Sequence, residues 1–168
     1  MNITPVEAKW IEENIKSIDF LSFLKPPELN QVIENVSPRI LTGSQAVLKE
    51  GQMGNLFFLI YNGKVSVSIQ RQGKQSKLAV LQKGDFFGEI SLMTGKPATA
   101  DVMALAPTKV FFLDNNQFLS LVRPNKDVVN FLIKTMKKRL TERKDAIEAL
   151  KYGNIAEINQ AIKDFLSK

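Results

Sequence analysis

The sequence predicts an α+β protein in which an antiparallel, jelly-roll-like β roll of about eight strands is flanked by N-terminal helices and a long C-terminal helix. Two observations support this fold class. Between residues 39 and 113, short apolar segments alternate with polar positions and are separated by glycine-containing turns. On either side of that stretch, apolar residues recur at helical spacing. We therefore divide the chain into N-terminal helices at 1–36, the β roll at 37–122 and C-terminal helices at 123–168.

The first helix is predicted from a capping box. Thr4 is placed as the N-cap and Pro5 as the first helical residue, and Glu7 is spaced to bond back to the Thr4 backbone. The residues of this helix expected to face the core are Trp10, Ile11 and Ile15. A second short helix is expected at 28–35, after the Pro26-Pro27 pair stops the preceding segment.

The β roll is predicted from alternation and turns. Apolar and polar residues alternate most clearly in one segment, with Val65, Val67 and Ile69 on one side and Lys64, Ser66 and Ser68 on the other. The dipeptides Asn62-Gly63 and Gln72-Gly73 are typical hairpin turns, so we expect antiparallel hairpins at both.

The C-terminal region returns to helical periodicity. We expect a short helix at 115–121, a long one from the Pro124-Asn125 pair to about residue 150, and a short terminal helix after Gly153. A stripe at three- and four-residue spacing comprises Ile133, Met136, Leu140, Ile147 and Leu150, with Arg143 filling its one gap. The stripe either forms a parallel coiled-coil seam that makes a homodimer or packs on the protein's own β roll, and we favour the homodimer.

Composition limits the function classes. The chain of 168 residues has no Cys and no His, which excludes disulfides and thiol catalysis and argues against a zinc site or a catalytic triad. We therefore expect no enzyme and no metal cofactor. No apolar stretch is long enough to span a membrane, and acidic residues at 12–13 interrupt the region a signal peptide would need, so we expect a cytoplasmic protein.

The net charge of +6 is placed unevenly. Residues 1–122 carry 12 basic and 11 acidic side chains, whereas residues 123–168 carry 11 basic and 6 acidic ones. A basic helix favours anionic partners, but these cations are spread around the helix, which is more typical of a solvated face. No aromatic stacking platform or groove-reading element is evident, so we expect no specific DNA binding.

Residues 84–100 carry the most informative pattern, GDFFGEISLM followed by TGKPATA. Glycine tolerates positive φ and close contacts, and successive backbone N–H groups at a short helical turn form a nest for an anion. A carboxylate beside such a nest, here Glu89, accepts hydrogen bonds from sugar hydroxyls. This segment, which we call the cassette, therefore predicts a nucleotide pocket.

The cassette resembles the phosphate-binding cassette of the cyclic-nucleotide-binding domain family, the regulatory module of catabolite activator proteins, cyclic-nucleotide-dependent kinases and cyclic-nucleotide-gated channels. The family pattern reads roughly FGELAL, a few residues, then PRAA, and this chain reads FGEISL at 87–92 and PATA at 97–100. The likeness covers about residues 20–145. It implies a regulatory module whose ligand is a cyclic nucleotide, cAMP or cGMP.

The resemblance also implies which residues contact the ligand. Glu89 takes the ribose 2′-hydroxyl, and the surrounding backbone holds the phosphate together with Thr99. The positions that bind ligand in the family correspond here to Phe87, Gly88, Glu89, Ile90, Ser91, Ala98 and Thr99. In some relatives a hydroxyl at the position of Thr99 favours guanine over adenine, although Thr is also a routine strand residue.

Ala98 is the main departure, because the family carries at this position an Arg that pairs with the cyclic phosphate. Without that Arg fork, binding should weaken by about 3 kcal/mol, or roughly a hundredfold in affinity. Lys96 is the nearest cation in the sequence, and Asp101 adds a negative charge nearby. Lys96 either reaches the phosphate as a point charge or is solvated, and we favour the second interpretation. We therefore expect weak binding of cAMP and cGMP.

The long helix carries Arg143 and Lys144 where resembling activators have small hydroxyl residues near the base. Three functions stay open: a sensor module with weak or altered cyclic-nucleotide binding, a degenerate domain that acts as a protein-interaction or dimerisation scaffold, and a sensor of a larger anionic nucleotide held by these two cations. About 18 residues follow residue 150, too few for the helix-turn-helix unit of related transcription factors. We therefore expect a module without its own output domain, served by a separate protein partner.

Overall fold

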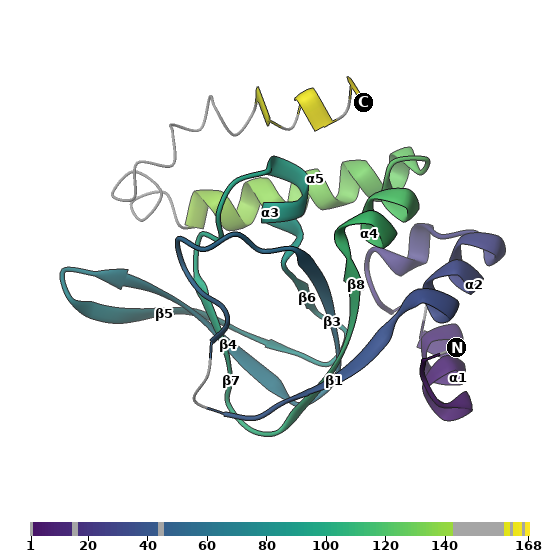
Figure 1. Ribbon diagram of the computed structural model, residues 1–168, viewed down its shortest axis with the longest axis horizontal. Coiled ribbons are helices and arrows are strands. Elements are labelled where there is room, and N and C mark those ends of the chain that lie inside the picture. The colour runs from purple at the N-terminus through teal and green to yellow at the C-terminus, as the bar shows by residue number, and fades with distance from the viewer. Residues whose placement is uncertain (1, 15–16, 44–45, 143–159, 162, 166) are drawn as a thin grey trace.

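The β roll predicted from the sequence is present in the structure, a computed structural model that describes every residue except 1, 15–16, 44–45, 143–159, 162 and 166. Among the described residues, eight strands form two four-stranded sheets. Figure 1 shows helices on one side of the roll and a long helix across one end of it. The predicted α+β fold class is confirmed.

The two sheets take their strands from alternate parts of the chain. Their orders are β1-β8-β3-β6 in sheet A and β2-β7-β4-β5 in sheet B. Sheet A consists of β1 (Ser37–Leu41), β8 (Thr108–Asp114), β3 (Leu56–Asn62) and β6 (Phe86–Phe87). Sheet B consists of β2 (Ala46–Leu48), β7 (Asp101–Ala104), β4 (Lys64–Arg71) and β5 (Lys74–Gln82). Since β1 pairs antiparallel with β8, the chain leaves the roll beside the point at which it entered.

One of the two predicted hairpins is present. Gln72 and Gly73 connect β4 to β5 with φ values of 48° and 76°, the positive pair that a tight hairpin turn requires. The prediction for Asn62-Gly63 was wrong, because β3 pairs with β6 and β8 whereas β4 pairs with β5 and β7. Gly63 instead carries the chain from one sheet to the other, and a Cβ there would lie 2.4 Å from the Thr108 hydroxyl.

Six helical segments with defined bounds accompany the strands, and the described residues among 160–167, other than 162 and 166, are helical as well. Before the roll come α1 (Pro5–Asn14), η1 (Leu21–Phe23) and α2 (Pro26–Asn35). Between β6 and β7 lies α3 (Glu89–Thr94), and after the roll come α4 (Asn115–Val122) and α5 (Lys126–Glu142). Pro26 and Pro27 lie in the first turn of α2, so the prediction that they stop the chain ahead of the helix was wrong. Proline is tolerated in that turn because the N–H that it lacks would have no hydrogen-bond partner within the helix.

The predicted capping box of α1 is confirmed. The Thr4 N–H donates to Glu7 Oε2 at 2.8 Å, and the Glu7 N–H donates to Thr4 Oγ1 at 3.3 Å. Glu7 is buried and forms an ion pair with Lys109 of β8, which ties α1 to sheet A. Burial alone would raise the pKa of Glu7, but the hydrogen bonds from Lys109 and Thr4 outweigh it and hold the pKa below its ordinary value.

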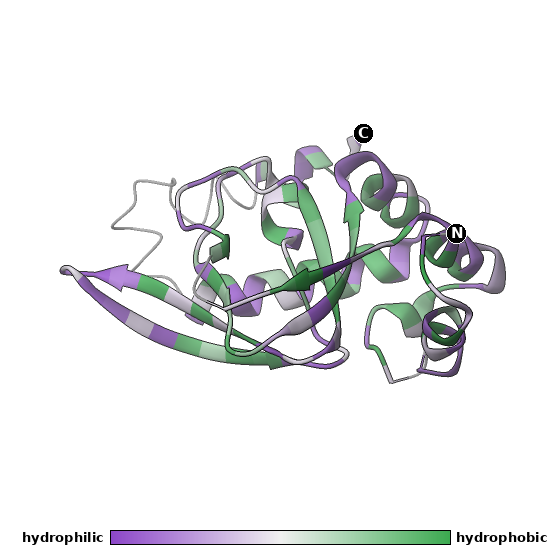
Figure 2. Ribbon diagram, turned by 60° about the horizontal axis from the view of Figure 1, so that its bottom comes forward, coloured by the Kyte–Doolittle hydropathy of each residue, from purple (hydrophilic) through white to green (hydrophobic). Residues whose placement is uncertain are grey.

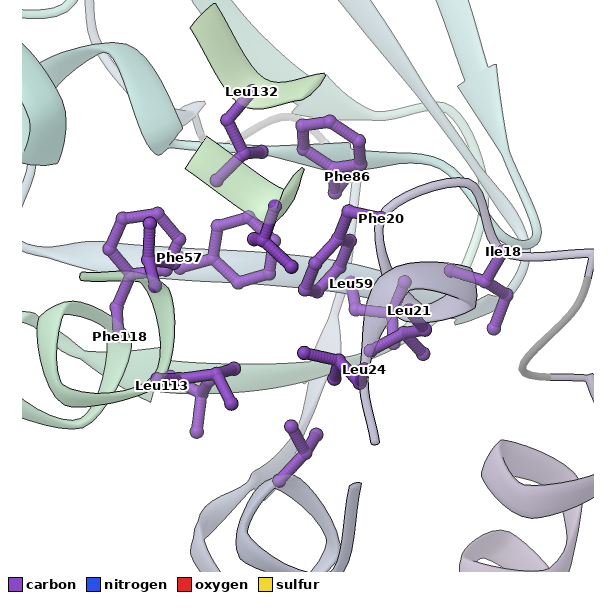
Figure 3. Packing of buried hydrophobic residues seen from close by; sticks show 14 of the residues in the cluster. Ile18, Phe20, Leu21, Leu24, Phe57, Leu59, Phe86, Leu113, Phe118 and Leu132 are labelled. Atoms are coloured by element: carbon purple, nitrogen blue, oxygen red, sulfur yellow. The ribbon is translucent and has the colours of Figure 1, made fainter. Parts of the chain in front are cut away.

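Strand β3 separates two apolar clusters. Phe57 and Leu59 belong to the cluster between sheet A and the helices, whereas Phe58 and Ile60 belong to the cluster inside the roll. Figure 3 shows the first cluster, in which the rings of Phe20, Phe57, Phe86 and Phe118 meet Leu132 of α5. In contrast to these apolar clusters, hydrophilic residues predominate at the far tip of the β4–β5 hairpin (Figure 2).

The apolar stripe of α5 packs on the protein's own β roll. Met136 and Leu140 are 0% and 5% exposed within the helix-covered cluster, and Ile133 packs against it. Of the two interpretations of the stripe, packing on the protein's own β roll therefore holds for the residues of the stripe that the structure describes. Residues 147 and 150, and the turn predicted at Gly153, lie outside the described residues.

Candidate functional site

The cassette follows strand β6 and turns sharply at Gly88. Its φ of +92° is strained for any residue with a side chain, and a Cβ would lie 2.3 Å from the carbonyl oxygen of Leu56. Only glycine lets the cassette backbone press against β3 at this point. The chain then enters α3, and one side of this helix faces the interior of the roll.

A cavity of about 30 Å³ lies where α3, the loop before β7 and sheet B meet. All seven residues predicted from the family pattern line it: Phe87, Gly88, Glu89, Ile90, Ser91, Ala98 and Thr99. The outer wall is formed by the half-buried Leu48 and Leu81 and by Arg139 of α5. In this structure the cavity has room for one or two water molecules.

Glu89 and Arg139 form a buried ion pair inside this cavity. Glu89 is 1% exposed, and its Oε1 accepts a hydrogen bond from Arg139 Nη1 at 2.7 Å. Arg139 Nη2 donates to the Phe86 carbonyl oxygen at 2.8 Å, and the guanidinium lies 4.8 Å from the centre of the Phe86 ring. Helix α5 is thus joined to the cassette by charge, hydrogen bonds and a cation–π contact.

Sequence reasoning missed Arg139, which it counted among the solvated cations of the long helix. The signal available was its spacing, because Arg139 follows Met136 by three residues and precedes Leu140 by one, which places it at the edge of the buried face. Its partner, however, lies 50 residues away in the chain, and no local pattern indicates that pairing.

Ala98, which the sequence pattern aligns with the family's phosphate-binding Arg, is buried. It is 5% exposed and presents a methyl group to the cavity. Its backbone is fixed on both sides: the Ala98 N–H donates to the Gln52 carbonyl at 2.8 Å, and the Gly51 N–H donates to the Ala98 carbonyl at 2.9 Å. These two bonds hold the backbone of Ala98 against residues 51–52.

Of the other predicted cations, the structure describes only Lys96. Lys96 is half-buried and lines a second, larger cavity of about 620 Å³ between α3, Arg123 and the C-terminal residues, not the cassette cavity. Arg143 and Lys144 lie outside the described residues. Among the described residues that line the cassette cavity, Arg139 is the cation, and Glu89 is its counter-ion.

Comparison with known proteins agrees with this geometry. The profile of the family "Cyclic nucleotide-binding domain" matches residues 38–125. The chain belongs to the cyclic nucleotide-binding domain family. It is 31% identical over 110 residues to the cAMP-dependent protein kinase regulatory subunit of Yarrowia lipolytica, covering 66% of this chain and 29% of that protein. The match spans about a third or less of the length of this and other curated regulatory subunits.

Solved structures share the fold. A cyclic-nucleotide-binding domain of a protein kinase A regulatory subunit, bound to Sp-2Cl-cAMPS, is 26% identical with a TM-score of 0.67 and covers 83% of this chain and 94% of that one. The regulatory subunit of a cAMP-independent protein kinase A from Trypanosoma cruzi, bound to guanosine, is 22% identical with a TM-score of 0.65 and covers 73% of this chain and 44% of that one.

The described residues contain no group of three or more His, Cys, Asp or Glu side chains that is arranged to hold a metal ion. Nor does any of their helices have the length and apolar character needed to cross a membrane.

Proposed function

We propose that this chain is a non-enzymatic regulatory sensor module whose cassette cavity binds cyclic nucleotides weakly. The observation that carries the proposal is Ala98, a buried methyl at the position of the phosphate-pairing Arg, in a cavity whose described cation is already paired with Glu89. The similarity to kinase regulatory subunits supports a regulatory role. It also supports a separate protein partner that carries the regulated activity.

The expected weakness follows from the hydrogen bonds that Ala98 cannot make. Two charge-assisted bonds from an Arg to the phosphate are worth about 3 kcal/mol together, which corresponds to roughly a hundredfold in affinity. Arg139 is a poor substitute, because turning it toward a phosphate would leave the 1%-exposed Glu89 without a counter-ion.

Glu89 is the group that would recognise the sugar. A buried carboxylate accepts hydrogen bonds from ribose hydroxyls, and the bond from Arg139 orients this one. The Trypanosoma cruzi neighbour supports a sugar-centred interpretation, since that protein shares the fold and is bound to guanosine, a ligand with no phosphate.

The second candidate is a scaffold that binds no nucleotide, and the cavity volume of about 30 Å³ favours it, because a nucleotide cannot enter until the wall moves. A homodimer through the long helix stays a proposal of its own. Met136 and Leu140 are already buried in the protein's own core, so a dimer seam would draw on other positions of that helix.

Titration calorimetry with cAMP and cGMP tests the sensor proposal on the wild type, Ala98→Arg and Glu89→Gln. We expect weak binding to the wild type, an increase of roughly a hundredfold in Ala98→Arg, and loss of binding when Glu89→Gln is added. Low-micromolar binding to the wild type would show that another cation neutralises the phosphate. No binding even to a folded Ala98→Arg protein would favour the scaffold.

A further inference from the structure

We propose that the ligand of the cassette cavity is an uncharged ribonucleoside, bound in preference to the corresponding cyclic nucleotide. This inference rests on the proposed function, because it concerns the same cavity and names its class of ligand. Three features of the described residues carry it: the balance of charges around the cavity, the groups at the phosphate position, and the hydrogen-bonding capacity of Glu89.

The described groups around the cavity offer no net positive charge. Arg139 and Glu89 lie 2.7 Å apart and cancel each other. Next to the lining, the Asp101 carboxylate accepts the Glu50 N–H at 2.7 Å, and the Glu50 carboxylate in turn accepts a backbone N–H at 2.8 Å. A cyclic phosphate would therefore bring an uncompensated negative charge into a desolvated site, whereas a nucleoside brings none.

The wall at the phosphate position carries neutral groups. Ala98 presents a methyl, and Ser91 and Thr99 present hydroxyls, with all three side chains about as buried as the core. A serine hydroxyl donates one hydrogen bond and accepts two, so Ser91 matches the free 5′-hydroxyl of a nucleoside without any counter-charge. In a cyclic nucleotide the 5′-oxygen is esterified and presents the phosphate here instead.

Glu89 favours a sugar with two free neighbouring hydroxyls. Arg139 bonds to its Oε1, and an ionised carboxylate has about four acceptor sites. A nucleoside offers both the 2′- and the 3′-hydroxyl as donors. A 3′,5′-cyclic nucleotide offers only the 2′-hydroxyl, because its 3′-oxygen is also esterified, so it forgoes one charge-assisted hydrogen bond to Glu89.

Entry of either ligand requires the wall to open from about 30 Å³. Leu48 and Leu81 are half-buried at the outer wall, and Arg139 stands beside them. Movement of Leu48 and Leu81 opens the wall while Arg139 keeps its bonds to Glu89 Oε1 at 2.7 Å and to the Phe86 carbonyl at 2.8 Å. The ribose hydroxyls then bond to the remaining acceptor sites of Glu89, so the charge of the pair stays balanced.

The test is titration calorimetry on the wild-type chain with matched pairs that share a base: adenosine with cAMP, and guanosine with cGMP. We expect the nucleoside of at least one pair to bind roughly tenfold or more tightly than its cyclic partner, with an affinity that changes little with salt. The corresponding 2′-deoxynucleoside, which removes one donor to Glu89, should bind roughly tenfold more weakly than the nucleoside.

Two variants sharpen the result. Ala98→Arg should reverse the order within each pair, because it supplies the phosphate charge, whereas the matched control Ala106→Arg adds the same charge on an exposed turn and should leave the order unchanged. Circular dichroism checks that each variant folds. If Ala98→Arg does not fold, the order of ligands in the wild type still decides the question.

The outcomes separate this inference from the proposed function. Cyclic nucleotides that bind the wild type weakly, while nucleosides bind more weakly still, would overturn the inference and leave the sensor function in place. Absence of binding by all four ligands, to the wild type and to a folded Ala98→Arg variant, would overturn both.

Discussion

Replacing Arg139 with Leu should destabilise the protein strongly, because it leaves Glu89 as a buried carboxylate without its cation. Glu89 is 1% exposed, and the side chain of Arg139 is 16% exposed, so water screens neither group well. Breaking a buried pair by removing one partner costs about 3–5 kcal/mol. The Phe86 carbonyl loses its donor as well, and we expect a total loss of about 4 kcal/mol, a large part of a typical domain's stability.

Urea denaturation followed by the fluorescence of Trp10, the one tryptophan of the chain, measures this loss. The matched variant Arg139→Lys keeps the positive charge but not the planar guanidinium with its two hydrogen bonds, and it should lose less stability than Arg139→Leu. The double variant Glu89→Leu with Arg139→Leu should recover much of the stability, because no charge is then left buried alone. A loss under about 1 kcal/mol for Arg139→Leu, or simple additivity in the double variant, would refute the coupling of the two side chains.

Three other expectations follow from the structure. Gly88→Ala should cost at least about 2 kcal/mol in thermal unfolding, and the control Gly95→Ala less, because Gly95 also has positive φ but no atom within 4 Å of its added Cβ. Because the pKa of Glu7 is lowered in the folded protein, its contribution to stability is present above its ordinary pKa of 4.5 and is lost as pH falls through the folded pKa. The Glu7→Gln variant should therefore lose less stability than the wild type when pH falls from about 7 to about 3. Leu140→Asp should unfold the chain, because Leu140 is buried in its own core, so light scattering on the wild type is the direct test of the homodimer.

The parts of the fold that the sequence predicted are those specified by neighbouring residues. The capping box at Thr4 and the turn at Gly73 each lie within four residues of their partners, and both are present. The turn at Gly63 failed because the local signal says that the chain turns, but not that β4 joins the other sheet. The prediction from the apolar stripe on α5 was ambiguous for the same reason, because the same spacing of apolar residues suits packing against a partner helix and packing against the chain's own β roll.

The candidate site divides in the same way. The seven residues taken from the cassette pattern all line one cavity, because glycine at position 88 and the carboxylate after it are fixed by the backbone geometry of a single segment. Arg139 was missed because its role depends on how α5 packs against β6, a contact between segments about 50 residues apart. Lys96 was the nearest cation in sequence, yet it lines a different cavity, so proximity along the chain was the wrong guide.

The Glu89–Arg139 pair bears on the choice between a sensor and a scaffold. A buried ion pair is a weak source of stability, and apolar residues of similar volume would hold α5 on the cassette at least as well. A scaffold that binds no ligand therefore has no physical need for a carboxylate at this point. Under the function that we propose, Glu89 accepts hydrogen bonds from the hydroxyl groups of a ligand, and the cavity wall at Ala98 offers that ligand a methyl group and no charge. For this reason we prefer the sensor, with a site that recognises a sugar, to the scaffold.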